Sequence, residues 1–260
     1  MRTANRLSIN GSPTGLPSLS IRSPSRLVGF QKKIKQFESI SDDIGKQDSG
    51  LQDAFHNATI DFLLKVKGVE ISLDTLFTVD AGMYHGIKVQ TADMHGNPIN
   101  QSIRCTGSSR FYGSPPRLDW VWARLTPIRE GCLPPFKALK GRTACRLLRL
   151  FTLSLRNVSK NMNLHCAFVQ TTKVAAGGLP EEESTMVRVL PTYGHERYRV
   201  ISAATIVGAA HLVPEDPTSE IGWTVNSHID CATWNDIYWM YEDDLRAAVE
   251  SGLRGGKRKR

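Results

Sequence analysis

Apolar residues recur at helical spacing in two early stretches of the chain. In the first, residues 26–40, Phe30, Ile34 and Phe37 are three or four residues apart and lysines lie on the opposite side, which predicts a short helix. In the second, residues 51–68, one stripe runs through Leu51, Phe55, Ala58, Phe62 and Val66. This stripe predicts a second helix, and the polar segment between the two stretches predicts a break.

After residue 68 the apolar positions alternate with polar ones, which is typical of β-strands. Residues 86–93 and 97–105 flank the turn sequence Gly96-Asn97-Pro98 and are expected to form a hairpin. In residues 117–125, Trp120 and Trp122 are expected on one face and Val121 and Ala123 on the other. Three more segments have the strand pattern, namely 165–172, 185–192 and 198–207, whereas 145–155 fits a helix or a strand.

A last helical pattern follows in residues 230–253. One side of it would carry Trp234, Ile237, Tyr238, Tyr241 and Leu245. Asp230 stands where an N-cap belongs, and Gly252 is a natural stop. The nearby His228 and Asp230 also allow a catalytic His–Asp pair, but no nucleophile motif accompanies them. We therefore expect structural roles for Asp230, Trp234 and Tyr238.

These elements predict a mainly β (α+β) fold, with an antiparallel sheet or small barrel, short N-terminal helices and a C-terminal helix. The strands are too closely spaced for intervening helices, which disfavours βαβ units. A small barrel would be analogous to chromatin-associated BAH-like modules. The expected organisation is a disordered basic arm (1–25), a helical segment (26–68), a mainly-β domain closed by the C-terminal helix (69–253) and a basic tail (254–260).

The charge distribution indicates a polyanionic partner. The formal net charge is +8, and the first 37 residues contain seven Lys or Arg and no acid. The tail adds a second basic cluster, which suggests a nuclear address or a phosphate-binding arm, although short basic tails are often simply solvated. An Arg- and Ser-rich start also fits a mitochondrial transit peptide, but its Ser-Pro steps interrupt any amphipathic helix. We expect a nuclear protein, with a mitochondrial location as the alternative.

The five cysteines form no CxxC pair, so we expect reduced and mostly buried thiols and no cofactor. The chain lacks a P-loop, a GxGxxG, an HExxH and a GxSxG motif. A metal-dependent hydrolase or nuclease remains the alternative function. Its candidate ligands are scattered, namely His85, His95 and His211 with Asp80, Asp93, Asp119 or Asp230.

Residues 104–122 interleave cations with aromatic side chains. Arg104, Arg110 and Arg117 are suited to gripping phosphate, and an aromatic residue such as Tyr112 can stack on a base. The alternative is structural, with Trp120 and Trp122 covering the end of a barrel. The predicted nucleic-acid-binding residues are Arg104, Arg110, Tyr112, Arg117, Lys257, Arg258, Lys259 and Arg260.

Three stretches, 104–125, 205–215 and 223–241, resemble the C-terminal region of proteins encoded by fungal DNA transposons of the Plavaka/KDZ type. The matching residues are Arg110, Phe111, Tyr112, Gly113, Ala209, Ala210, His211, Leu212, Pro214, Val225, Asn226, Ile229, Asp230, Thr233, Trp234, Asn235, Ile237 and Tyr238. The catalytic core usual in such elements has no counterpart here. The resemblance therefore implies a non-catalytic accessory or relic domain, which would bind DNA or a chromatin-associated protein.

Overall fold

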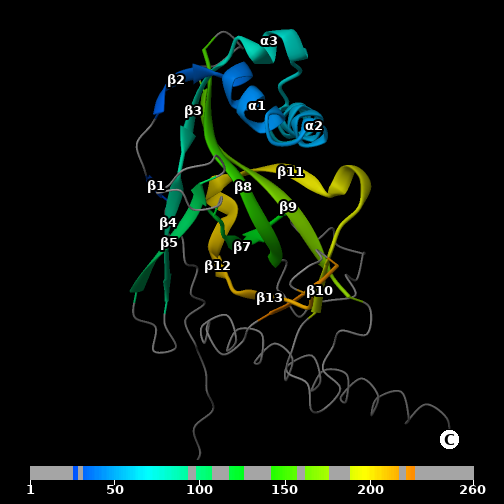
Figure 1. Cartoon of the computed structure of the whole chain (residues 1–260). Coiled ribbons are helices and arrows are strands. Elements are labelled where there is room, and N and C mark those ends of the chain that lie inside the picture. The colour runs from blue at the N-terminus through cyan, green and yellow to red at the C-terminus, as the bar shows by residue number, and fades with distance from the viewer. Residues whose placement is uncertain are drawn as a thin grey trace, which may run out of the picture.

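The computed structural model describes residues 26–28, 32–92, 98–106, 117–125, 142–156, 162–175, 188–216 and 221–225. In this part of the chain, a large antiparallel sheet lies between three helices on one face and a small antiparallel sheet on the other (Figure 1). The helices are α1 (Phe37–Gly45), α2 (Ser49–Lys67) and α3 (Leu73–Phe77).

The small sheet has the strand order β1-β4-β5-β6. Its strands are β1 (Arg26–Val28), β4 (Gly86–Ala92), β5 (Pro98–Thr106) and β6 (Arg117–Leu118). The large sheet runs β12-β7-β8-β9-β10-β14-β13, with β3 and β2 added beside β8 and β11 beside β9. Its strands are β2 (Lys32–Gln36), β3 (Asp80–Tyr84), β7 (Trp120–Arg124), β8 (Arg142–Leu155), β9 (Met162–Val174), β10 (Arg188–Pro191), β11 (Tyr198–Ser202), β12 (Ile206–Ala210), β13 (Leu212–Pro214) and β14 (Trp223–Val225).

The long strands β8 and β9 form the centre of the molecule, since every other strand of the large sheet is joined through them. Their antiparallel ladder has a bulge between Leu147 and Arg149. The first half of β8 pairs with β7 and the second half with β3. Both faces of β8 are apolar, because one faces the helices and the other faces the small sheet. This explains why the sequence of residues 145–155 is compatible with either a helix or a strand.

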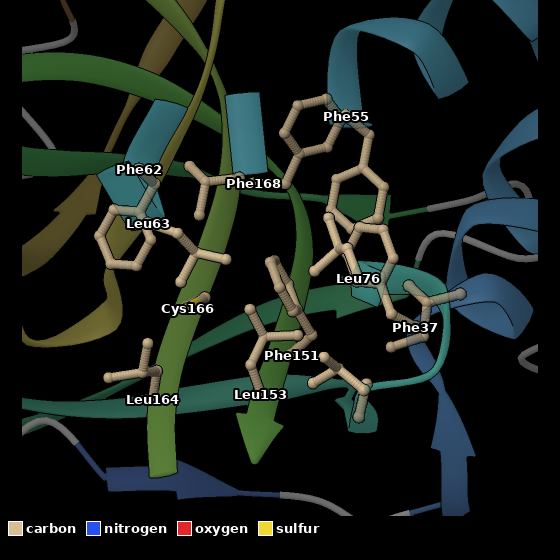
Figure 2. Packing of buried hydrophobic residues seen from close by; sticks show 14 of the residues in the cluster. Phe37, Phe55, Phe62, Leu63, Leu76, Phe151, Leu153, Leu164, Cys166 and Phe168 are labelled. Atoms are coloured by element: carbon tan, nitrogen blue, oxygen red, sulfur yellow. The ribbon is translucent and has the colours of Figure 1, made fainter. Parts of the chain in front are cut away.

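Aromatic residues pack the helices onto the large sheet, in a set we call the helix-side core (Figure 2). The Phe55 ring of α2 stacks on Phe37 at 4.8 Å between centroids. It also meets Phe151 of β8 and Phe168 of β9 edge-on, at 5.2 and 5.0 Å. All four rings are fully buried. Burial of such large side chains is the main stabilising contribution that these helices receive.

Both ends of α2 carry the residues that helix termini favour. The Asp48 carboxylate accepts hydrogen bonds from the backbone N–H groups of Gly50 and Leu51, at 2.9 and 3.3 Å. Gly68 ends the helix in the left-handed conformation, with φ of 64°. A side chain at this position would be strained, so the glycine ends the helix at low cost.

A second core lies between the two sheets. Alternate residues of β4 and β5 point into it and meet β7, β8, β9 and β12. Its buried residues are Ile87, Val89, Ile103, Cys105, Val121, Ala123, Cys145, Leu147, Leu150, Ala167, Val169, Ile201, Ala203 and Ile206. This core leaves the alternating residues of β4 and β5 on the outer face of the small sheet.

A third cluster lies on the helix side of the large sheet and contains Trp122 and Trp223, with Trp120 packed against it. The rings of Trp120 and Trp223 are 4.7 Å apart. The end strands of the sheet, β12 and β13, are separated in sequence only by His211, so the sheet curls around these residues. The ladder found among the described strands does not close into a barrel. The prediction of a mainly antiparallel β fold with N-terminal helices is confirmed, and a small closed barrel is not found.

The predicted helix over residues 26–40 is wrong over most of its length. Residues 26–28 and 32–36 are edge strands, and the helix begins only at Phe37, whose N–H donates to the Val79 carbonyl at 2.9 Å. Strand β2 pairs with β3 through a register shift between Lys32 and Lys35. Of the apolar residues at helical spacing, Ile34 therefore lies in a strand and Phe37 begins the helix, because pairing with β3 overrides the weak local pattern.

Other strand predictions hold with smaller corrections. The hairpin of residues 86–93 and 97–105 is confirmed as β4 and β5, and Trp120 and Trp122 share a face as expected. The segment 198–207 is two strands, because a 3₁₀ turn at Ala203–Thr205 separates β11 from β12. The basic arm, the C-terminal helix with Asp230, Trp234 and Tyr238, and the basic tail lie outside the described residues.

Candidate nucleic-acid interface

Two of the predicted nucleic-acid-binding residues fall on one sheet. Arg104 lies in β5, and Arg117 lies in the adjacent strand β6. The other predicted residues lie outside the described part of the chain: Arg110, Tyr112, Lys257, Arg258, Lys259 and Arg260.

The outer face of the small sheet is polar and basic. Along β4, Ile87 and Val89 are buried against the large sheet while Lys88 between them is exposed. Along β5, Ile103 is buried while Ser102 and Arg104 are exposed. This alternation follows from the twofold period of a strand with one covered face. Lys88 and Arg104 therefore share the uncovered face.

The strand register brings these two cations close together. Lys88 is directly opposite Ser102, and Gly86 is opposite Arg104, so Lys88 and Arg104 are diagonal neighbours. Such neighbours are about 7–8 Å apart in antiparallel sheets. At the backbone level, Arg26 of β1 is opposite Lys88, and Arg117 of β6 is opposite Thr106. The register thus aligns four basic positions across the sheet.

The strands β1, β4, β5 and β6 contain no Asp, no Glu and no aromatic residue. Asp119 directly follows β6, and its carboxylate accepts a hydrogen bond from the backbone N–H of Arg104 at 2.8 Å. The Asp119 N–H in turn donates to the Arg104 carbonyl at 3.2 Å. Asp119 therefore fixes the backbone of β5. Within the described ranges, neither Lys88 nor Arg104 forms an ion pair.

Trp120 and Trp122 pack inside the protein and do not form an exposed platform for stacking on bases. Trp122 is 2% exposed and Trp120 is half-buried, and both belong to the cluster around Trp223. They lie on the opposite face of the large sheet from the small sheet. Arg104 and these two aromatic residues therefore do not form one surface, although they are close in sequence.

The candidate metal ligands stay apart where the structure describes them. No group of three or more His, Cys, Asp or Glu side chains suited to a metal occurs in that part of the chain. His85 joins β3 to β4, and His211 joins β12 to β13. Asp80, at the start of β3, approaches the Arg156 guanidinium at 3.8 Å. His95, Asp93 and Asp230 fall outside the described ranges.

Three cysteines are buried free thiols: Cys105, Cys145 and Cys166. Burial raises the pKa of each to about 12. The prediction of reduced, buried thiols is confirmed for these three. At neutral pH they are protonated, so they are unsuited to nucleophilic or metal-binding chemistry.

Sequence reasoning missed a polar contact between α1 and α2. The Ser41 hydroxyl and His56 Nε2 are hydrogen-bonded, and the Gln52 amide donates to the same hydroxyl at 3.0 Å. Burial lowers the pKa of His56, although Asp53 and Asp42 oppose the shift. Ser41 is fully buried, so a substrate has no access to it. His56 follows Phe55 on the covered side of α2, which is the signal in the sequence that pointed to its burial.

No known protein family, no curated protein and no solved structure matches this chain. In the described part, none of the helices is long and apolar enough to cross a membrane. The candidate interface therefore rests on the geometry of the small sheet.

Proposed function

We propose that the chain is a non-catalytic DNA-binding protein that uses the outer face of the small sheet. The observation that carries this proposal is the pairing of exposed Lys88 and Arg104 on an acid-free face. Exposed cations on adjacent strands can bind the phosphates of a nucleic-acid backbone. The net charge of +8 supports the same partner, because it favours approach to a polyanion.

The binding mode follows from the residue types on this face. Lys88 and Arg104 are accompanied by neutral polar residues such as Ser102, and the strands supply no aromatic platform for stacked bases. Contacts to phosphate position a protein but carry little sequence information. We therefore propose that the chain binds DNA with little sequence preference and that the affinity falls as the salt concentration rises. Arg110, Tyr112 and the tail from Lys257 to Arg260 would add contacts around the sheet.

The proposal extends to origin and location. The resemblance of residues 104–125, 205–215 and 223–241 to Plavaka/KDZ-type transposon proteins supports a transposon-derived accessory or relic domain. The basic tail supports a nuclear location. The alternative partner is a chromatin-associated protein. A measurement of direct binding to DNA distinguishes the two partners.

The test is a titration of labelled 20-base-pair duplexes with the full chain, followed by fluorescence anisotropy between 50 and 300 mM salt. Lys88→Gln with Arg104→Gln should lower the slope of log K against log salt by about 1.8, because each phosphate contact contributes about 0.9. This corresponds to a loss of affinity on the order of 50-fold at 0.1 M salt.

The matched control is Lys65→Gln with Lys67→Gln, which removes the same charge from exposed positions on α2. We expect it to change binding far less, since α2 lies on the other side of the large sheet. Equal losses in both double variants would show that only net charge matters. Absence of wild-type binding at 50 mM salt would refute the proposal and favour a protein partner.

A further inference from the structure

Tyr193 is 70% exposed, more than any other large apolar side chain in the part of the chain that the structure describes. It lies in the connection between β10 and β11, directly before a 3₁₀ turn at Gly194–Glu196. Tyrosine is one of the residue types that contribute most to binding when a partner covers the ring. The exposed ring is therefore a candidate contact for a partner.

Hydrogen bonds fix the backbone on both sides of Tyr193. The N–H of Thr192 donates to the Thr171 carbonyl at 3.2 Å, and the Thr171 N–H donates to the Arg197 carbonyl at 2.8 Å. The Thr171 hydroxyl also donates to the Glu196 carbonyl at 2.5 Å. A side chain that extends from a fixed backbone loses less conformational entropy on binding. The connection thus holds the ring ready for a partner.

Two cations lie beside this connection. Lys173 of β9 is exposed, and its ammonium group is 5.6 Å from the centroid of the Tyr193 ring. Arg199 of β11 is exposed and opposite Val169, so it lies on the same side of β9 as Lys173, roughly 13 Å along the strand. Neither cation forms an ion pair within the described ranges. Strands β9, β10 and β11 contain no Asp or Glu, and Glu196 is the one acid between β10 and β11. This surface is therefore complementary to an anionic partner.

An exposed aromatic ring beside cations suits the unpaired bases of a nucleic acid. A base stacks on the ring, and the cations contact the phosphates. An acidic peptide would use the cations but supplies no regular series of flat groups for the ring, and a duplex keeps its bases inside its own stack. We propose that Tyr193, Lys173 and Arg199 form a binding site for single-stranded nucleic acid. A base stacks on Tyr193, and neighbouring phosphates contact Lys173 and Arg199.

This site is separate from the proposed duplex interface. It is built on β9, β11 and the connection before β11, which belong to the large sheet, whereas Lys88 and Arg104 lie in the small sheet. The inference therefore does not rest on the proposed function.

The experiment is a fluorescence-anisotropy titration of the full chain with two labelled 12-nucleotide strands at 50 mM salt. One strand is oligothymidylate, and the other has the same sugar–phosphate backbone with every base removed. We expect the wild type to bind oligothymidylate about 5- to 150-fold more tightly than the abasic strand, because only a base can stack on Tyr193. Equal affinity for the two strands would overturn the proposal.

Substitutions then locate the stacked base. Tyr193→Ala should remove the difference between the two strands, whereas Tyr193→Phe, which keeps the ring, should preserve it. Ile221→Ala is the matched control, since it shortens another exposed apolar side chain, and it should leave the difference unchanged. Lys173→Gln with Arg199→Gln should lower the slope of log K against log salt by about 1.4. A difference that survives Tyr193→Ala would overturn the site.

Two further measurements separate this site from its alternatives. A labelled polyglutamate peptide with the net charge of the strand represents an acidic protein partner, and binding as tight as that of oligothymidylate would overturn the choice of nucleic acid. Lys88→Gln with Arg104→Gln should leave the difference between the two strands unchanged, whether or not the chain binds a duplex. Loss of the difference in this double variant would place the stacked base on the small sheet and overturn the assignment to Tyr193.

Discussion

The helix-side core and the outer face of the small sheet differ in the exposure of their side chains, which are buried in the first region and exposed in the second. In the core, Phe55 contacts three other aromatic rings and has no exposed surface. On the outer face, Lys88 and Arg104 are exposed and lack an ion pair within the described ranges. Substitutions in the first region should change stability, and substitutions in the second should change binding. The following predictions test this separation.

The largest expected effect is on stability. Phe55→Ala removes the ring at the centre of the helix-side core and should lower the free energy of unfolding by about 3–5 kcal/mol. Leu64→Ala on the same helix, where the side chain is 48% exposed, should cost less than about 0.5 kcal/mol. Urea denaturation measures both values. At a temperature where Phe55→Ala is folded, its DNA affinity should equal that of the wild type; a large change in affinity would break the separation.

The next effect concerns thiol reactivity. With pKa values of about 12, Cys105, Cys145 and Cys166 carry about a thousandfold less thiolate at pH 8 than thiols at their ordinary value of 9.0. Alkylation followed by mass spectrometry should find these three unmodified in the native protein and modified in urea. Rapid native labelling of Cys166 would show that the helix-side core is open to solvent.

A smaller effect is expected at the edge of the outer face. Arg117→Gln should lower DNA affinity about eightfold at 0.1 M salt and reduce the salt slope by about 0.9, if the interface extends to β6 as the register suggests. Anisotropy titrations measure both quantities. An unchanged slope would confine the interface to β4 and β5.

The Asp48 cap at the start of α2 should contribute about 0.5–2 kcal/mol, since Asp48→Ala leaves two backbone N–H groups without their acceptor. Asp61→Ala, which breaks only the exposed contact with Lys65 at 2.7 Å, serves as the control and should cost about 0.3–0.5 kcal/mol. Thermal denaturation compares the two. Equal costs would contradict the role of the cap.

Acidification should weaken the contact between α1 and α2. Because burial lowers the pKa of His56 below its ordinary value of 6.5, the unfolded chain takes up a proton more readily than the folded chain. Stability should therefore fall as the pH decreases through 6.5, and this contribution levels off below the folded-state pKa. Urea denaturation at pH 7.5 and 6.0 should show a larger loss for the wild type than for His56→Gln. Equal losses would assign the pH dependence to other groups.

Strands could be predicted from the sequence where one face of the strand is buried and the other is exposed to solvent. The exposed Lys88 between the buried Ile87 and Val89 follows directly from such alternation, and the pairing of β4 with β5 was predicted as a hairpin. The buried strand β8 and the edge strand β2 were not readable, because burial on both faces and an irregular register remove the alternating signal.

The candidate interface was only partly readable for a related reason. Arg104 and Arg117 stood out because they belong to one cationic, aromatic stretch, but Lys88 looked like an ordinary solvated residue. Only the pairing of β4 with β5 brings it beside Arg104. The sequence wrongly grouped Trp120 and Trp122 with the arginines of this stretch. The strands β6 and β7 follow one another in sequence but belong to different sheets.

The most direct test of the central claim is a ¹⁵N NMR titration of the chain with a short DNA duplex at low salt. We expect the largest shifts at the backbone amides of Lys88, Ser102 and Arg104, and almost none at Leu63 within the helix-side core. Shifts concentrated on α2, with β4 and β5 unchanged, would contradict binding through the small sheet.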